Sequence, residues 1–329
     1  MSTTLYRLNR LITGVLTILL CSNTAVVGGT LWLSDKSPHA SHGGAHAHGG
    51  PVKVRRGVYY KNLWLRHGDQ PQNDNYITGG THFSPMYLLD AKGQISEVKV
   101  ERDKMHGMLN VDFPMPDEGF YNAYIDHQWI NNGQRLYLIA KAEVLKHSCR
   151  EGHDHVKENM PSKHNPKIPL EIVRERLPKE NFHTLIGYGD TITFTVMSKG
   201  KPQPGAEVTL TTERGWSKKE TSDENGQVSY AMIRDYYPKW HEFNKRNPQS
   251  YVVSAEYKAP ISGYLDGEHY NDTLYRSSYF GNFYPSPRDY ESYAYGLSFG
   301  VFALVFSGLA IYLYRRRRNR PYREVQFDE

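Results

Sequence analysis

Cysteine is scarce in this sequence, and common catalytic motifs are missing from it. The 329 residues include two cysteines, Cys21 in an apolar run and Cys149 in a polar one. We do not expect them to meet, which excludes an internal disulfide framework. The sequence contains no phosphate-binding loop, dinucleotide fingerprint or His-Glu-x-x-His motif. Cys149 and His153 could pair as nucleophile and base, but a His-crowded loop would orient them poorly. We therefore expect a protein that is not an enzyme.

Excess charge of one sign is also limited. The formal net charge is +5, and the run Arg315–Arg318 supplies much of it. Arginines that directly follow an apolar run indicate membrane orientation and not a nucleic-acid footprint. No stripe of basic and aromatic residues is present, so we expect no nucleic-acid partner.

Long apolar runs occur only at the two ends of the chain. Residues 294–314 carry no charge and precede a basic tail, 315–329, which predicts a transmembrane helix with a cytoplasmic C-terminus. Small residues recur on one face of this helix, at Gly296, Gly300, Ala303 and Ser307. Such a face favours pairing with another helix in a homo- or hetero-oligomer, although small residues are also ordinary in membrane helices.

The first apolar run has two interpretations. A cleaved signal peptide would end near Cys21, but the residues that follow form a poor cleavage site. An uncleaved signal anchor over residues 11–33, after a cytoplasmic segment 1–10, has the length needed to cross a bilayer and would place Trp32 at the outer interface. We favour the anchor, which predicts a two-pass protein of the bacterial inner membrane with both termini cytoplasmic and most of the chain in the periplasm.

The region between the apolar runs has the pattern of β-structure. Short strands with alternating apolar residues are separated by turns rich in Gly, Asn, Asp and Pro, such as Asn131–Gly133 and Asp223–Gly226. This spacing predicts a mainly β protein with two antiparallel, Ig-like β-sandwich modules, at residues 58–145 and 168–258. A Tyr-rich segment, 259–293, lacks clear periodicity, and we expect it to lie extended along a partner or the bilayer.

The second module carries a resemblance to a known family. Glu171–Val173, Gly189–Val196, the run Gly-Lys-Pro-Gln-Pro-Gly-Ala-Glu-Val at 200–208 and the turn Asp223–Gly226 resemble an uncharacterised periplasmic family described as the periplasmic component of nickel or cobalt transport systems. The resemblance covers roughly residues 170–257 and implies metal handling outside the inner membrane, without a reaction. The Gly-Lys-Pro-x-x-Gly signature also occurs in many Ig-like modules, so it indicates the fold more than the function.

Two stretches concentrate metal-ligand side chains. A loop at 146–167 joins the modules and contains His147, Cys149, His153 and His155, with Met160 and His164 shortly after. Imidazole and thiolate suit soft or borderline cations, and a thioether would favour copper. A flexible linker at 34–57 adds a His-rich tract, with His39, His42, His46 and His48. Both stretches are also compatible with solvated polar linkers.

These patterns support two hypotheses. In the first, the chain is a membrane-anchored periplasmic protein that binds copper, nickel or cobalt and delivers it to an integral membrane partner. In the second, it is a non-catalytic accessory subunit of a multisubunit membrane enzyme or transport complex, and its histidines are incidental.

Overall fold

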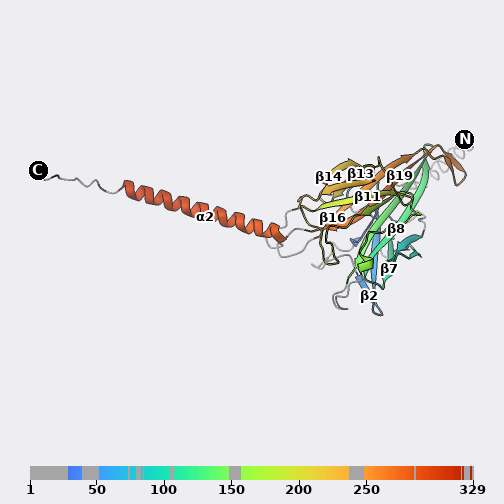
Figure 1. Cartoon of the computed structure of the whole chain (residues 1–329), viewed down its shortest axis with the longest axis horizontal. Coiled ribbons are helices and arrows are strands. Elements are labelled where there is room, and N and C mark those ends of the chain that lie inside the picture. Colours follow the sequence, from blue (N-terminus) through green and yellow to red (C-terminus); the bar gives the residue numbers. More distant parts are fainter. Residues whose placement is uncertain are drawn as a thin grey trace, which may run out of the picture. The chain divides into compact units, whose positions relative to one another are not determined.

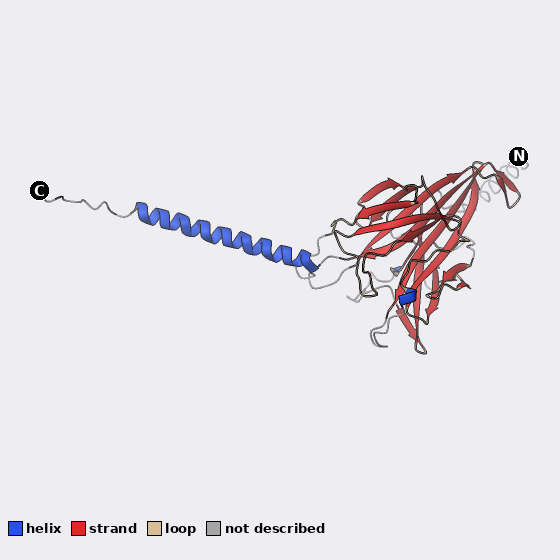
Figure 2. Ribbon diagram, in the orientation of Figure 1, coloured by secondary structure: helices blue, strands red, loops and turns tan. Residues whose placement is uncertain are grey.

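The computed structural model of the chain describes residues 29–38, 52–72, 75–78, 83, 85–103, 107–147, 157–236, 248–284, 287–319, 321 and 327. Two compact units are present, one built from the β-strands up to residue 284 and one from the C-terminal helix α2 (Pro287–Arg318) (Figure 1). Strands dominate the first unit, and a short 3-10 helix, η3 (Lys157–Asn159), lies within it (Figure 2). The prediction of a mainly β protein is confirmed.

The strands form three main sheets and one small hairpin. The central sheet has eight strands, in the order β14 (Ser217–Thr221), β13 (Glu207–Thr212), β16 (Gln249–Ala259), β19 (Asp272–Phe283), β9 (Gln134–Lys146), β8 (Gly119–Asn131), β4 (Met86–Leu89) and β5 (Ile95–Val98). A five-stranded sheet contains β1 (Leu31–Ser34), β2 (Val52–Arg55), β3 (Val58–His67), β6 (Glu101–Arg102) and β7 (Leu109–Met115). A four-stranded sheet contains β10 (Glu171–Arg174), β11 (Thr191–Ser198), β12 (Lys201–Pro202) and β15 (Gln227–Ala231). The hairpin pairs β17 (Gly263–Leu265) with β18 (Glu268–Tyr270).

A tight turn sets the register of the two longest neighbouring strands. Asn132 and Gly133 connect β8 to β9, and both have positive φ, 51° and 73°. Two consecutive residues in this conformation make the turn whose twist matches a hairpin, and Asn-Gly is a preferred sequence for it. The strands then pair without interruption from Asn131↔Gln134 to Gly119↔Lys146.

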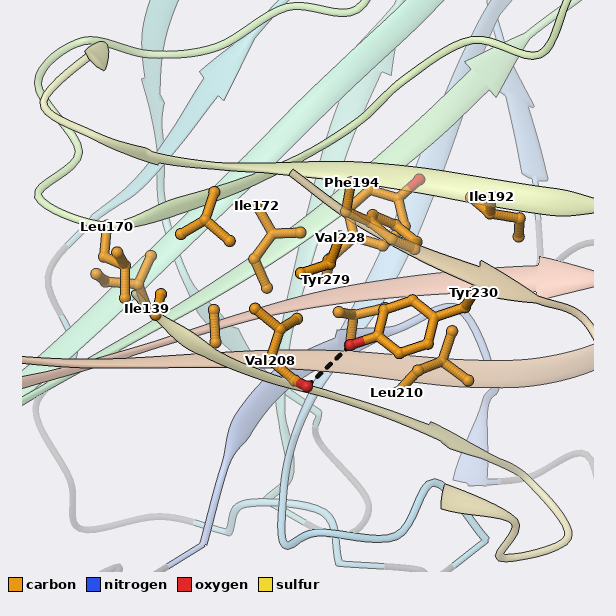
Figure 3. Packing of buried hydrophobic residues seen from close by; sticks show 14 of the residues in the cluster. Ile139, Leu170, Ile172, Ile192, Phe194, Val208, Leu210, Val228, Tyr230 and Tyr279 are labelled. Atoms are coloured by element: carbon orange, nitrogen blue, oxygen red, sulfur yellow. Dashed lines mark hydrogen bonds between the residues drawn. The ribbon is translucent and has the colours of Figure 1, made fainter. Parts of the chain in front are cut away.

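The central sheet is buried on both of its faces at strand β9. Ile139 belongs to one core cluster, whereas its neighbours Leu138 and Ala140 belong to another. The first core lies against the four-stranded sheet, and in Figure 3 Ile139 is seen with Ile172, Phe194 and Tyr230, whose hydroxyl donates to the Val208 carbonyl at 2.8 Å. The second core includes residues of β1, β3 and β7 from the five-stranded sheet. Because successive side chains of a strand point to opposite faces of the sheet, neighbouring residues of β9 belong to two different cores.

One sheet joins the regions expected to form separate modules. Strand β19 pairs in parallel with β9, from the expected first module, and antiparallel with β16, from the second. It comes from the Tyr-rich segment 259–293, which instead of running extended along a partner supplies β17, β18, β19 and the start of α2. Some of its tyrosines are core residues: Tyr275 and Tyr279 are buried in the first cluster, whereas Tyr264 is exposed.

The predicted membrane helix at residues 11–33 extends too far toward the C-terminus. Residues 11–28 lie outside the described residues, but Leu31–Ser34 forms β1, which pairs antiparallel with β3. Trp32, expected at the membrane interface, has no exposed surface and packs with Val252 and Phe280. An apolar run of this kind is compatible with a buried strand as well as with a membrane helix. The pairing with β3 shows that residues 31–34 form a strand. The expected flexible linker 34–57 likewise gives Ser34 to β1 and residues 52–55 to β2, while its four histidines lie outside the described residues.

The predicted C-terminal membrane helix is confirmed as a helix. Residues 294–314 lie inside α2, and the stretch Tyr293–Arg318 is long and apolar enough to cross a bilayer. It is the one such helix among the described residues. Arg315–Arg318 occupy the last turn, where positive charge interacts favourably with the helix dipole.

Candidate functional site

Three of the ten predicted ligand residues lie in the described part of the chain. Cys149, His153, His155, His39, His42, His46 and His48 lie outside it. Of the described three, His164 is exposed, and the Met160 carbonyl accepts a hydrogen bond from Arg176 Nε at 2.8 Å. His147 follows directly after β9. Within the described ranges, no group of three or more His, Cys, Asp or Glu side chains is arranged to hold a metal ion.

His147 contacts three side chains that come from two other parts of the sequence. Its Nδ1 contacts a carboxylate oxygen of Glu118, and its ring stacks on Phe182 with the centroids 5.7 Å apart. The His183 ring stands almost perpendicular to it, at 85°, with a centroid separation of 4.4 Å. The His147 side chain keeps 11% of its surface exposed and Glu118 keeps 18%. The His147 and Glu118 side chains are therefore mostly enclosed, with a small part of each open to solvent.

The hairpin register brings Glu118 beside His147. The last pair of the β8–β9 ladder is Gly119↔Lys146, so the next residue on each strand lies at the same end of the hairpin. Asn159 Nδ2 also donates to the Glu118 carbonyl at 2.6 Å. Gly119 has a φ of 134°, and a Cβ there would lie 2.6 Å from the Asn159 Cβ, so this position requires glycine. The backbone that carries Glu118 is thus fixed from two sides.

A compact turn presents His183. The Asn181 side chain accepts a hydrogen bond from the His183 amide at 2.8 Å, and Thr184 Oγ1 accepts one from the Asn181 amide at 3.0 Å. Phe182 points inward and is 5% exposed, with its ring 6.0 Å from that of Phe120. The buried Phe182 anchors the turn and leaves His183 exposed at the surface. Sequence reasoning missed His183 because no local motif marks it, and only the fold brings it to His147.

A second polar cluster lies in the middle of β9 and is fully buried. Lys141 Nζ donates to Glu171 Oε1 at 2.7 Å, and the two side chains are 1% and 2% exposed. The Tyr124 hydroxyl donates to the same oxygen at 2.8 Å, and the Asn165 amide donates to Glu171 Oε2 at 2.8 Å. Burial, followed by the charge of Glu171, raises the pKa of Tyr124 well above its usual value. This tyrosine therefore remains a hydrogen-bond donor.

Glu143 extends the buried polar cluster by two residues along β9. Arg176 binds its carboxylate with two hydrogen bonds, of 2.8 and 2.9 Å, and Tyr279 donates to it at 3.2 Å. Arg174 lies 3.4 Å from Glu143 and makes two shorter contacts with Glu180, at 3.0 and 2.7 Å. Burial alone would raise the pKa of Glu143, but Arg176 and Arg174 outweigh that effect and lower it to about 2.

The chemistry of this buried cluster is structural. Its two carboxylates on β9 and β10 each face a cation and further donors, and both are shielded from water. Charged groups are buried in proteins when they are paired in this way. The cluster links β9 of the central sheet to β10 of the four-stranded sheet through buried ion pairs.

Comparisons with known proteins give little beyond distant structural likeness. No family model matches the chain, and no curated protein matches it. Among solved structures, it is similar to one from work on host cell-surface retention of a 1.5-MDa bacterial ice-binding adhesin, with 11% identity over 69% of this chain and a TM-score of 0.22. It is also similar to a tetra-tandem repeat from the extending region of a large adhesion protein (12% identity, 78% of this chain, TM-score 0.21) and to the BSP domain of a biofilm-associated protein (12%, 66%, 0.16). The chain spans 58%, 49% and 27% of those three chains, and TM-scores this low support no statement about function.

Proposed function

We propose that this chain is a membrane-anchored periplasmic protein that binds a transition metal ion, namely copper, nickel or cobalt, and delivers it to a membrane partner. The observation that carries the proposal is the placement of His147. It begins the donor-rich stretch 147–155, and it lies beside a second imidazole and a carboxylate at a partly open position. Imidazole suits each of these metals. The resemblance of residues 170–257 to a nickel or cobalt transport family supports the same function.

The membrane anchor of the proposal is α2. Its apolar stretch would span the bilayer, and Arg315–Arg318 would lie on the cytoplasmic side, because positive residues are retained there. The β-strands precede α2 in sequence and would therefore lie on the opposite side, in the periplasm of a bacterial inner membrane. A second, N-terminal span would have to end before Thr30, since Leu31–Ser34 is a buried strand.

Metal content is the test of this function. The full-length chain, purified in mild detergent and equilibrated with Cu²⁺, Ni²⁺ or Co²⁺, should retain at least one ion after gel filtration. A variant with His147, Cys149, His153 and His155 all changed to Ala should retain clearly less. The matched control is His269→Ala, which removes an exposed imidazole from the β17–β18 hairpin. Equal metal content in the quadruple variant and the wild type would remove this stretch from the proposal.

One observation favours the alternative of a non-catalytic accessory subunit. Gly296, Gly300, Ala303 and Ser307 recur at helical spacing on α2, which allows close approach of another membrane helix. A stoichiometric membrane protein that co-purifies with the wild type, and is lost from Gly300→Leu, would support this alternative. Metal retention together with a monomeric chain would argue against it.

A further inference from the structure

We infer that one end of the β-strand unit binds the surface of a phospholipid bilayer, with an exposed leucine in the headgroup layer and an exposed arginine on lipid phosphate. The inference rests on one part of the proposed function, the anchoring of the chain by α2, and it concerns a surface that metal binding does not use. We call this surface the rim. It comes from the loop before β11, the β13–β14 turn and the segment after β15, and consists of Leu185, Tyr188, Arg214 and Tyr236.

The length of the connecting chain limits how far the rim can lie from the bilayer. Tyr284 is the last residue of the β-strand unit, and the apolar stretch of α2 begins at Tyr293. The three chain steps from Tyr284 to Pro287 extend at most about 11 Å, and the six helical steps to Tyr293 rise about 9 Å. When α2 spans a bilayer, Tyr284 therefore lies within about 20 Å of the hydrocarbon, of which the headgroup layer fills about 5–7 Å.

A series of contacts joins Tyr284 to the rim. The Tyr284 amide donates to the Ile186 carbonyl at 2.8 Å, which places the loop before β11 beside the last strand residue. Two residues further on, the Tyr188 hydroxyl lies 3.5 Å from the Tyr236 carbonyl oxygen. The Arg214 guanidinium in turn lies 4.5 Å from the centre of the Tyr236 ring. The rim thus lies at the end of the β-strand unit where the chain continues into α2.

Arg214 gives the rim an exposed positive charge. It forms no ion pair with a carboxylate in the part of the chain that the structure describes, and its contact with Tyr236 leaves the side chain exposed. The carboxylates of neighbouring residues are already held within the fold: Glu213 pairs with Lys36, and Asp190 accepts a hydrogen bond from the Gly187 amide at 2.7 Å. A planar guanidinium matches the geometry of phosphate, which every phospholipid headgroup carries.

Leu185 gives the rim an exposed apolar side chain. It is 43% exposed and lies in a loop, so its side chain can enter the headgroup layer without the loss of any strand pairing. The half-buried Tyr188 and Tyr236 add rings with an apolar body and a polar tip. Such residues are enriched where proteins meet the membrane–water interface. The composition of the rim therefore suits a lipid surface.

The far end of the same sheet supplies a matched control. The β16–β19 ladder runs from Gln249↔Phe283, next to Tyr284, to Ala259↔Thr273. These ten steps along β16 cover about 33 Å. Ile261 follows the far end and is 41% exposed, close to the value for Leu185. Labels at the two positions therefore differ in the end of the sheet they report on, and not in exposure.

The test measures the contact of each end with lipid headgroups. The full-length chain carries Cys21→Ser and Cys149→Ser together with Leu185→Cys or Ile261→Cys, and the single thiol is labelled with a fluorophore. It is reconstituted into vesicles of phosphatidylcholine and phosphatidylglycerol, with or without a lipid that has a nitroxide on its headgroup. The nitroxide should shorten the fluorescence lifetime of the label on Leu185→Cys and leave that of the label on Ile261→Cys unchanged. Equal shortening at the two positions would overturn the inference.

Arg214→Gln tests the contact with phosphate. Added to the Leu185→Cys chain, it should lower the ratio of quenched to unquenched label about fivefold, the effect of one basic residue near an anionic surface. The control Lys201→Gln removes an exposed positive charge at the end of β11 that pairs with β12, and it should leave the ratio unchanged. Equal ratios in the two variants would overturn the role assigned to Arg214.

Flotation of the vesicles in a density gradient separates this inference from the function beneath it. If the chain does not float with the vesicles, α2 is not an anchor, and the proposed function and the inference fail together. If it floats but the headgroup nitroxide does not reach the label on Leu185→Cys, the anchor stands and the inference alone is overturned. Protection of that label from a water-soluble quencher, without nitroxide quenching, would assign the rim to a protein contact and would also overturn it.

Discussion

Strand β9 carries two polar clusters that differ in burial and in how completely their charges are paired. In the middle of β9, Lys141 and Glu143 are buried. Lys141 pairs with Glu171 on β10, and Glu143 pairs with Arg176, two residues after β10 ends. Just beyond the end of β9, His147 is mostly enclosed and lies beside the exposed His183. The side chains of the first cluster are shielded from water, whereas the second cluster includes the exposed His183. Burial and pairing therefore distinguish the structural cluster on β9 from the candidate site at its end.

Removal of the buried Glu143 carboxylate should have the largest effect on stability, and it tests the structural role of the cluster most sharply. Glu143→Ala would leave the guanidinium groups of Arg174 and Arg176 buried without it, and we expect a loss of about 3–5 kcal/mol in the free energy of unfolding. Chemical denaturation of the full-length chain in micelles, followed by tryptophan fluorescence, measures the change. If the proposed function holds, folded Glu143→Ala should keep the metal affinity of the wild type, because Glu143 lies four residues before His147 on the chain.

The matched control for Glu143→Ala is Glu207→Ala. Glu207 pairs with Lys219 at 2.8 Å, but both side chains are more than half exposed. Exposed pairs contribute little, so we expect a change within about 0.5 kcal/mol. Losses of similar size in the two variants would contradict a structural role for the buried pairing.

Acid should weaken the same cluster. The folded pKa of Glu143 is about 2, below its ordinary value of 4.5, because Arg176 and Arg174 outweigh the effect of burial. The stability that this depression contributes is fully present above about pH 4.5 and is lost as the pH falls toward 2, by about 3 kcal/mol in total. Unfolding free energies of the wild type and of Glu143→Gln, measured between pH 6 and pH 2.5, should converge. Parallel curves would rule out this source of acid sensitivity.

Tight packing at Gly281 on β19 also contributes to stability, and we expect a smaller change in the free energy of unfolding there. A Cβ on Gly281 would lie 2.5 Å from the Tyr251 ring, which has no exposed surface and is enclosed by Phe194, Tyr279 and Phe283. Gly281→Ala should therefore cost about 1–3 kcal/mol in denaturant unfolding. At Gly187 the nearest atom to a Cβ is 3.7 Å away, so Gly187→Ala should be nearly neutral. Equal stability of the two variants would show that Tyr251 can move aside.

The smallest effect on stability is expected at the candidate site. His147→Ala loses the contact with Glu118 and part of the packing on Phe182, but the site is partly open to water. We expect a loss of about 1 kcal/mol in the same unfolding assay. A loss as large as that of Glu143→Ala would place His147 in the structural cluster and remove the contrast between the two regions.

Local patterns predicted much of the fold. The alternation of apolar residues and the Asn-Gly turn predicted strands, and the structure has them at β8 and β9. The same turn contained an unused signal: its register, continued along both strands, brings Glu118 to His147. The partnership of β19 with β9 could not be predicted, because a parallel pair between segments far apart in sequence leaves no local mark.

Other features depended on tertiary context. Leu31–Leu33 is apolar enough for a membrane helix, and only its pairing with β3 makes it a buried strand. The charges of Lys141 and Glu143 interrupt the apolar pattern of β9 as exposed residues would, yet their partners on and next to β10 bury them. His183 belongs to the candidate site through the same kind of long-range packing. These are the places where a single sequence contains no information about the partner.

Anomalous diffraction from a crystal of the full-length chain grown with Cu²⁺ tests the central claim most directly. If the proposed function holds, an anomalous peak lies within bonding distance of His147, about 2.0 Å from a ring nitrogen. A copper-loaded crystal whose peaks all lie beyond bonding distance of His147 and of every residue in the stretch 147–155 would contradict it.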